Sequence, residues 1–418
     1  MELQMKKLML ILIALSLSGC AAFGRGVAEA ILENPEKTDS KKCEISGSKF
    51  AGIEQAFENK ETVKILMIHG VGTHKAGYST RIRDNLAAKL NLNVMSRRAK
   101  NITLLNPDNP EQIIGNLRVI RMQDEDDEKE FIFYELTWSE TTIKAKEILN
   151  FDVSGDYKYR RAAFNNTMKT FLDDVIPDPM IYLLDPNKLI LKAAKQSTCW
   201  MLGKSWDELS DGEKKVCHIS SHQEIQNLKK ENIIFITHSL GSKIMMDTLT
   251  DIVDMVGEAD GKHASDAQLI IDELKTKKIT VFMLANQLPL LQITRNKPKV
   301  SNQIPQYCSA NGIYRNKRIF DKVSIIAFSD PNDLLSYDIP QQFVDEYIDS
   351  RMCPEVTNVS INVADVISAF GVGVVNPVTA HTGYDNDSRV INIIANGTID
   401  YNPDSEIADK CRFIRIKD

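Results

Sequence analysis

The chain has no excess of positive charge, no closely paired cysteines and no long apolar run, and each absence excludes a class of protein. It holds 51 Lys and Arg against 57 Asp and Glu, so a net charge of -6 provides no basic field to attract nucleic acid. No Cys-x-x-Cys spacing occurs, which argues against a zinc or redox framework. Internal repeats and low-complexity tracts are also absent from the sequence. With 418 residues, the chain is expected to be a globular protein with a large core.

The first residues have the pattern of an export signal. Lys6-Lys7 precedes the apolar run 8–17, which is too short to cross a bilayer of about 30 Å as a helix. Leu17-Ser18-Gly19-Cys20 follows, and it resembles the lipobox of bacterial lipoproteins, in which the Cys becomes the lipidated first residue. We therefore expect a signal peptide at 1–19 and a lipid anchor on Cys20, with an ordinary cleaved signal as the alternative.

The residues after this segment suggest where the anchor holds the chain. Ala21 replaces the Asp that retains lipoproteins at the inner membrane of enterobacteria, so the resemblance implies a location on the outer membrane, facing the periplasm. Removal of residues 1–19 deletes two Lys and one Glu and changes the net charge to -7. Residues 20–60 begin polar and mixed, as expected for a tether that leads away from a membrane.

Six cysteines remain after Cys20, an even number that suggests disulfide bonds in an exported protein. Six thiols allow 15 connectivities, and the sequence does not choose among them. Cys199 with Cys217 is the most plausible pair because these two lie close together in the chain. The others are Cys43, Cys308, Cys353 and Cys411.

Short, continuous apolar runs separated by helical patterns predict the fold. Such runs are expected for the strands of a parallel sheet that is covered on both faces. We expect an α/β domain at 61–418 with a mostly parallel central sheet flanked by helices, and a helical cap inserted at about 139–230 over the C-terminal ends of the strands. A peripheral position for this insert is the alternative. The runs are residues 63–68, 117–121, 131–136, 233–236, 279–285, 323–328 and 356–363.

The run at 233–236 leads into Thr237-His238-Ser239-Leu240-Gly241, and an apolar helical pattern follows at once. This order of strand, sharp turn and helix is typical of a nucleophile elbow, usually written G-x-S-x-G, which lifts a Ser hydroxyl clear of the sheet. Thr237 stands where the first Gly is expected. If the turn is tight, we expect Thr237→Gly to be tolerated and Thr237→Leu to clash.

Two further strand ends supply the residues that a Ser nucleophile needs. Asp330 and Asp333 follow the run at 323–328, and His381 lies in a loop after the run at 356–363. The order Ser, acid, His resembles that of the α/β-hydrolases. His69-Gly70-Val71-Gly72 is similar to their oxyanion turn, and Ala380-His381-Thr382-Gly383-Tyr384 to the His loop of lipase-like members. The resemblance covers residues 60–418 except the helical insert.

The resemblance implies a role for each residue. His381 would be the base that accepts the Ser239 proton, and Asp333 would fix its tautomer, with Asp330 as the alternative acid. Backbone amides of Val71 and Leu240 would bind the oxyanion, supported by Gly70 and Gly72. The implied activity is cleavage of a carboxylic ester by a lipase, phospholipase or esterase, with amide cleavage also possible.

No metal or cofactor is expected for this reaction. His69, His74 and His238 share no carboxylate at a ligand spacing, and His69 is expected to bond the backbone of the turn instead. Trp138 is expected to anchor the core. A different class of function stays open, namely a non-catalytic envelope lipoprotein that uses the fold as a binding scaffold. A secreted effector is a third possibility, and the oligomeric state is not predicted.

Overall fold

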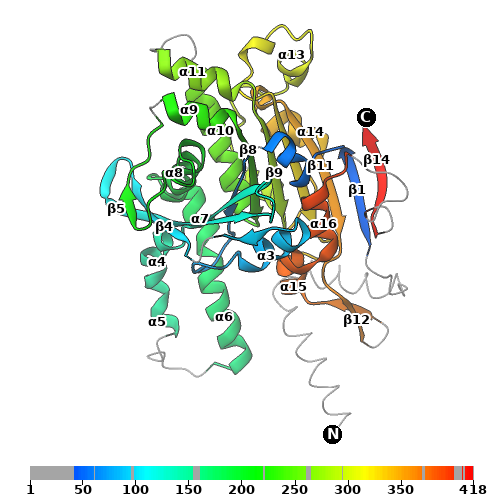
Figure 1. The fold of residues 1–418 in the computed structure, drawn as a ribbon. Coiled ribbons are helices and arrows are strands. Elements are labelled where there is room, and N and C mark those ends of the chain that lie inside the picture. The colour runs from blue at the N-terminus through cyan, green and yellow to red at the C-terminus, as the bar shows by residue number, and fades with distance from the viewer. Residues whose placement is uncertain are drawn as a thin grey trace.

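A computed structural model describes residues 42–60, 62–95, 98–153, 161–219, 222–259, 265–293, 295–369, 372–399, 407 and 410–417. Signal peptide, Cys20 and most of the predicted tether therefore lie outside the described residues. The described chain has α/β architecture, with one large mixed sheet between layers of helices (Figure 1).

The sheet has 12 described strands, and its main path runs β14-β1-β11-β10-β9-β8-β2-β6-β5-β4-β7, with β3 paired to β5. The six central strands from β11 to β6 are all parallel, as the continuous apolar runs predict. The strands are β1 (Cys43–Ser48), β2 (Thr62–Ile68), β3 (Asn93–Val94), β4 (Lys100–Asn106), β5 (Asn109–Gln123), β6 (Glu130–Thr137), β7 (Glu213–Lys215), β8 (Glu231–His238), β9 (Lys278–Leu284), β10 (Lys322–Ser329), β11 (Pro354–Ile361) and β14 (Arg412–Lys417), with a separate hairpin of β12 (Val366–Ala369) and β13 (Val372–Val375).

The helices connect these strands and cover both faces of the sheet. They are α3 (Thr80–Lys89), α4 (Glu140–Lys146), α5 (Asn150–Val153), α6 (Ala163–Val175), α7 (Pro177–Leu184), α8 (Leu189–Gly203), α9 (His222–Lys229), α10 (Gly241–Ala259), α11 (Ser265–Leu274), α12 (Leu288–Gln292), α13 (Ile304–Cys308), α14 (Gln341–Tyr347), α15 (Pro377–Thr382) and α16 (Ser388–Asn396). Short 3-10 turns are η1 (Glu54–Lys60), η2 (Glu147–Leu149), η3 (Arg315–Lys317), η4 (Ser350–Met352) and η5 (Gly383–Asn386).

Alternate residues of each central strand enter two separate apolar cores. On β2, Leu66 and Ile68 pack in the core that α8 and α10 cover, whereas Ile65 and Met67 pack in the core that α3 and α16 cover. Successive side chains of a strand point to opposite faces, so a strand that is apolar at every position needs helices on both sides. This requirement explains the three layers and leaves the C-terminal ends of the strands as the edge where loops can gather.

The predicted helical insert divides into two parts. Helices α5 and α6 project from the C-terminal edge of the sheet (Figure 1), whereas α7 already places Tyr182 in the core that contains Leu66. Likewise, α8 buries Ala193, Trp200 and Met201 in the same core as Leu66, and β7 pairs with β4. The expected cap at 139–230 is therefore too long, because the amphipathic pattern of 189–203 belongs to a helix that covers the sheet.

The predicted tether also extends too far along the chain. Cys43–Ser48 forms β1, which lies between β11 and β14, and Glu54–Lys60 forms η1. Because β1 is antiparallel to β11, with Cys43 opposite Ile361, the chain enters the sheet at its C-terminal edge. β14 lies beyond β1, so the strand predicted at 356–363 is not the last one.

The six cysteines form three disulfides in the structure. Cys199 is bonded to Cys217, the pair that proximity favoured, and the other bonds join Cys43 to Cys411 and Cys308 to Cys353. Cys43–Cys411 links the two neighbouring strands β1 and the start of β14 across 368 residues of sequence. Among the described residues, no helix is long and apolar enough to cross a membrane.

Candidate active site

Ser239 forms the sharp turn between β8 and α10. Its φ angle is +55°, a left-handed conformation that is uncommon for residues other than Gly. The turn is held on both sides, because the Ser239 amide donates to Leu284 O at 2.9 Å and Ser242 Oγ donates to Ser239 O at 2.7 Å. This is the backbone geometry that the strand, turn and helix pattern predicts for an elbow.

Two glycines let the turn after β2 lie directly against Ser239. A Cβ atom on Gly70 would lie 2.6 Å from Ser239 Cβ, and one on Gly241 would lie 2.5 Å from Ile68 O. Contacts this short would displace backbone, so neither position accepts a side chain without movement. The close approach brings residues 70–73 to the elbow.

Thr237 fits the first position of the elbow without a glycine. Its side chain is fully buried, and its Oγ1 lies 3.4 Å from Phe282 O. If Ser239 acts as a nucleophile, we expect Thr237→Gly to keep its activity while losing about 1 kcal/mol of stability, because Gly weakens a strand interior. Thr237→Leu adds volume where no space is open, and we expect it to cost about 1–3 kcal/mol and most of the activity. Melting temperature and ester turnover measure both effects; equal activity in the two variants would show that the elbow is not tight.

His381 and Asp333 form a buried pair beside this turn. His381 Nδ1 donates to Asp333 Oδ2 at 2.8 Å although the residues are 48 positions apart. The Asp333 side chain is 1% exposed and that of His381 is 15% exposed. Burial opposes ionisation of Asp333, but the hydrogen bond and charge of His381 and the amide of Leu335 outweigh it, so the pKa of Asp333 is lowered. A carboxylate in this position fixes the histidine tautomer with Nε2 free to accept a proton.

Asp330, the alternative acid, has a different role in the structure. Its Oδ1 accepts the Asn332 amide at 2.8 Å, as in an Asx turn, and its Oδ2 accepts the amides of Val363 and Ala364 at 2.7 and 3.3 Å. Asp330 therefore braces the chain that leaves β11. Of the two candidate carboxylates, only Asp333 is brought to His381.

His238 ties the histidine loop to the nucleophile turn. Its Nε2 donates to His381 O at 2.8 Å, and the two rings meet edge to face with centroids 5.1 Å apart. Burial, followed by the charge of His381, lowers the pKa of His238 to about 3, so its ring stays neutral near pH 7. The residue just before Ser239 thus fixes the backbone of His381.

The two atoms that would exchange a proton are left without hydrogen bonds. Within the described part of the chain, Ser239 Oγ and His381 Nε2 are both buried and neither has a hydrogen-bond partner. Buried polar atoms are rarely left unpaired, and a catalytic role is one of the explanations for an exception. Bonds between a nucleophile and its base are also often looser before substrate binds.

The turn after β2 is held by carboxylates that the sequence did not indicate. Asp178 Oδ2 accepts the Gly72 amide at 2.6 Å, and Asp174 Oδ2 accepts the Thr73 amide at 2.9 Å. Lys146 Nζ lies 3.1 Å from Asp174 and 2.8 Å from Asp178, so one lysine joins both carboxylates. Helices α4, α6 and α7 therefore fix the shape of the turn, about a hundred residues away in sequence.

The predicted oxyanion donors differ from the amides that these carboxylates use. In the described ranges, the hydrogen bonds of the turn engage the Gly72 and Thr73 amides, whereas none engages the amide of Val71 or Leu240. Gly72 has a φ of +91°, which a residue with a side chain would adopt only with strain. Val71 and Leu240 thus remain the candidate donors, and Gly72 supports them through its conformation.

We expect Asp178→Ala to lower kcat about 10- to 100-fold with little change in KM, since a displaced turn would misplace an oxyanion donor. Asp178→Asn keeps an acceptor for the Gly72 amide and is expected to retain most activity. Steady-state kinetics on a soluble ester, with circular dichroism to verify folding, measures the difference. Asp251→Asn, which breaks a partly exposed pair with Lys195, is the matched control and should change kcat less than twofold. A normal kcat in Asp178→Ala would show that the carboxylate does not shape the site.

His69 packs behind the same turn, as expected. Its Nε2 accepts the Trp138 amide at 3.2 Å, so its Nδ1 carries the proton that bonds Gly70 O at 2.8 Å. The ring stacks between Trp138 and His74, with centroids 4.5 and 4.1 Å away, and Trp138 is fully buried in the core. Burial, followed by the charge of His74, lowers the pKa of His69 well below its usual value. His69 is therefore a neutral structural residue.

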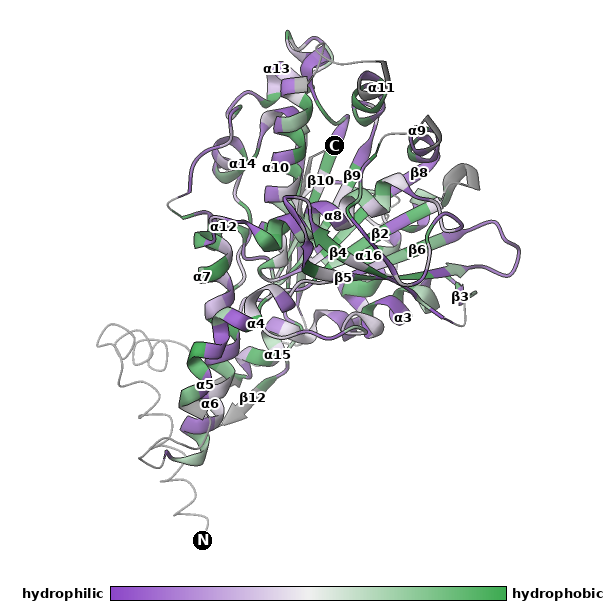
Figure 2. Cartoon of the chain, turned by 90° about the vertical axis from the view of Figure 1, so that its left-hand side faces the viewer, coloured by the Kyte–Doolittle hydropathy of each residue, from purple (hydrophilic) through white to green (hydrophobic). Residues whose placement is uncertain are grey.

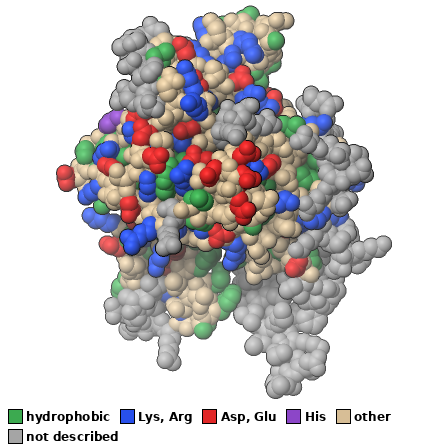
Figure 3. Space-filling view, in the orientation of Figure 1, with side chains coloured by type: hydrophobic (Ala, Val, Ile, Leu, Met, Phe, Trp, Pro, Cys, Tyr) green, Lys and Arg blue, Asp and Glu red, His purple; other side chains and the backbone are tan. Residues whose placement is uncertain are grey.

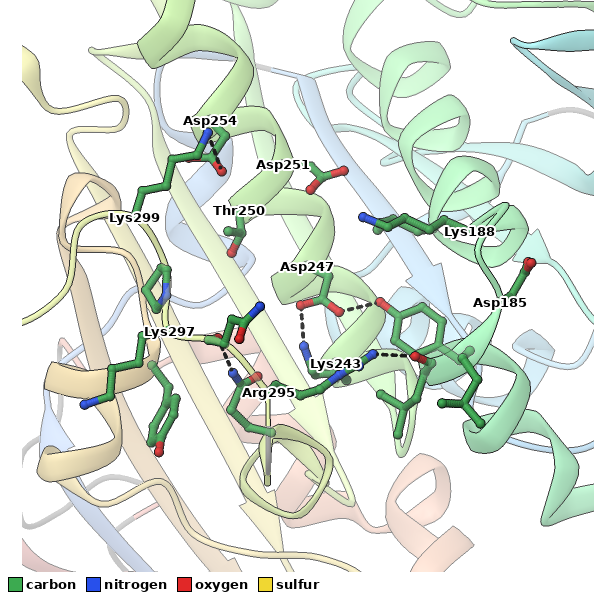
Figure 4. Close-up of a pocket in the computed structure, with 18 of the residues that line it drawn as sticks. Asp185, Lys188, Lys243, Asp247, Thr250, Asp251, Asp254, Arg295, Lys297 and Lys299 are labelled. Carbon is green, nitrogen blue, oxygen red and sulfur yellow. Dashed lines mark hydrogen bonds and ion pairs between the residues drawn. The ribbon is translucent and has the colours of Figure 1, made fainter.

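Two cavities of the described structure are not lined by Ser239. One, of about 560 Å³, lies between α7, α10 and residues 292–299, and Figure 4 shows that much of its charge is paired, as in Lys243 with Asp247 and Lys299 with Asp254. The other, of about 410 Å³, is apolar and lies between α8, α10, α11 and the first residues of β8. Neither is lined by the Ser239, His381 and Asp333 group. No cluster of His, Cys, Asp or Glu that could hold a metal occurs among the described residues.

Comparison of the chain with known protein families, curated proteins and solved structures finds no match.

Proposed function

We propose that this protein is a serine ester hydrolase of the α/β-hydrolase fold, held at the bacterial envelope by a lipid on Cys20. The observation that carries the proposal is the buried His381–Asp333 pair, tied through His238 to a Ser with positive φ. Ser239 and Asp333 follow the ends of β8 and β10, and His381 lies on α15, which gives the order Ser, acid, His. A fold that needed only stability would have no reason to bring a strained Ser and a carboxylate-bound imidazole together.

In the proposed reaction, Ser239 Oγ attacks the ester carbonyl carbon while His381 Nε2 takes its proton. The amides of Val71 and Leu240 stabilise the negative charge on the carbonyl oxygen. The C–O bond to the alcohol then breaks, and His381 returns the proton to the leaving oxygen. Water, deprotonated by His381, next attacks the acyl-enzyme, and the acid leaves as Ser239 regains its proton.

The lipase or phospholipase subclass is preferred among esterases. Its support is the lipobox-like sequence at Cys20 and the exposed apolar side chains beside the site, which include Leu334, Leu335 and Val378. Leu334 and Leu335 directly follow Asp333, and Val378 lies on the helix of His381. Amide substrates use the same chemistry, so substrate class must come from measurement.

Labelling with a fluorophosphonate probe tests the proposal. We expect the probe to form a covalent adduct on Ser239, located by mass spectrometry of the digested protein, and ester turnover on a panel of acyl lengths. Ser242→Ala is the matched control because Ser242 lies in the first turn of α10, and its hydroxyl bonds only to backbone groups, donating to Ser239 O and accepting from the Gln287 amide. A folded protein with neither adduct nor turnover would instead support a binding scaffold, a reading that the buried Ser239 hydroxyl favours.

A further inference from the structure

Exposed apolar side chains concentrate in one part of the described chain. Of its 23 large apolar side chains that are exposed, ten lie within residues 143–184, on α4, η2 and α5 to α7 and at the junctions between them. Figure 1 shows α5 and α6 projecting from the C-terminal edge of the sheet, and Figure 3 shows hydrophobic side chains on this lower part of the surface. Clusters of this kind mark contact sites with proteins or membranes.

Helix α6 carries the clearest part of this cluster. Phe164, Met168, Phe171 and Leu172 recur at spacings of three and four, so they share one side of the helix, which we name the α6 face. All four are exposed, at 58%, 38%, 46% and 37%, and no residue of α6 is buried. Figure 2 shows hydrophobic residues along this projecting helix. A soluble helix normally turns such a stripe toward a core. The α6 face has no core to cover in the described structure.

The position of the chain's entry point indicates what covers this face. Lys42 O accepts hydrogen bonds from the Asn362 amide and from Arg389, so the chain enters at the end of β11, on the edge that also carries Ser239 and α6. Cys20 precedes Lys42 by 22 residues, which span at most about 75 Å when extended. An anchor at Cys20 would therefore hold this edge toward the same bilayer and raise the effective concentration of the α6 face there.

We propose that the α6 face docks on a phospholipid bilayer, with its Phe and Met side chains among the upper acyl chains, and that docking turns the Ser239 edge toward the lipid. This proposal rests on the lipid anchor and ester hydrolysis proposed above. The face is convex and projecting, a shape suited to insertion rather than to enclosing a peptide. Since α6 carries Lys169 against Asp173 and Asp174, the proposed docking depends on apolar contact and not on attraction to anionic lipid.

Tryptophan fluorescence of the full chain tests this placement. Phe164→Trp is introduced into a Ser239→Ala chain, so that no lipid is hydrolysed, and the protein is bound to phosphatidylcholine vesicles. Interfacial helices bury their apolar side about 5–10 Å deep. After subtraction of the emission of the parent chain, which contains Trp138, Trp200 and Trp206, we expect the added emission of Trp at 164 to shift to shorter wavelength and to be quenched most by bromine high on the acyl chains. The same result is expected in 0.5 M NaCl.

Matched controls separate this docking from anchor-driven binding. Ile313→Trp places the probe at a residue that is 74% exposed but lies by α13, at the opposite edge of the molecule, and no shift is expected there. Phe164→Ser with Phe171→Ser is expected to weaken vesicle binding of a Cys20→Ser chain at least about 10-fold, whereas Leu269→Ser with Ile313→Ser leaves it unchanged.

Three results would overturn the proposal. One is a Trp at 164 that stays in water while the protein is bound to vesicles. Another is binding that 0.5 M NaCl abolishes. The third is a shift that appears without vesicles and grows with protein concentration, which would make a second copy the occupant. Fluorophosphonate labelling of the Phe164→Ser, Phe171→Ser chain with Ser239 intact reports separately on the hydrolase, so failure of one proposal is distinguishable from failure of the other.

Discussion

Replacing Ser239 with Ala is expected to lower kcat for ester cleavage about 10⁶-fold, to the rate that binding and oxyanion stabilisation alone provide. No other described hydroxyl of the turn can replace it, because Ser242 Oγ is directed to Ser239 O. His381→Ala is expected to cause a similar loss, since the hydroxyl is a poor nucleophile without a base.

A variant that carries both substitutions tests whether Ser239 and His381 act together. Groups that act as one unit in catalysis are not additive, so Ser239→Ala with His381→Ala should be about as slow as either single variant. Single-turnover rates on an activated ester measure all three, with wild-type melting temperatures as the control for folding. If the two losses multiply, Ser239 and His381 act independently and the proposed proton transfer between them is wrong.

The second large effect is expected for Asp333→Asn, with a fall in kcat of about 10⁴-fold. The Asn side chain has the same shape, but its amide group stabilises the wrong tautomer of His381 and does not balance an imidazolium. The lowered pKa of Asp333 adds a stability effect whose sign is clear. A carboxylate with a depressed pKa stabilises the fold above its unfolded pKa, and this contribution is lost as pH falls through the folded value.

Asp330→Asn is the matched control for this prediction. Asp330 accepts backbone amides of residues 332, 363 and 364, so Asn there is expected to cost about 1–3 kcal/mol of stability while kcat stays within about tenfold. Urea unfolding and steady-state kinetics of both variants give the comparison. A larger loss of kcat in Asp330→Asn than in Asp333→Asn would reverse the assignment.

The sequence predicted the parts of the fold that local patterns determine. Continuous apolar runs such as 323–328 mark buried parallel strands, because both faces of those strands meet helices. Ser239 and Asp333 could be placed because each follows a strand end, whereas His381, predicted in a loop, lies on helix α15 beyond the hairpin of β12 and β13. The choice between Asp333 and Asp330 was open, since both lie in one turn and only the position of His381 separates them.

The sequence predictions that were wrong concern elements whose position depends on contacts between distant parts of the chain. β1 contains Ser and Gly and has little strand preference of its own, and its place depends on β11 and on the bond from Cys43 to Cys411. The pattern of α8 predicts a helix but does not say what the helix covers. No sequence pattern pointed to Asp178, because its role depends on the Gly72 amide, which lies 106 residues away in the chain.

The bond between Cys43 and Cys411 also determines how the folded domain would carry a mechanical load. It closes nearly the whole described chain into a covalent ring, with β1 and the edge strand β14 at the closure. Tension applied through the residues before Cys43 therefore divides between two strands at once, instead of peeling β1 from β11. A domain tethered at this end to a moving surface would resist unzipping from its N-terminus for as long as the bond stays oxidised.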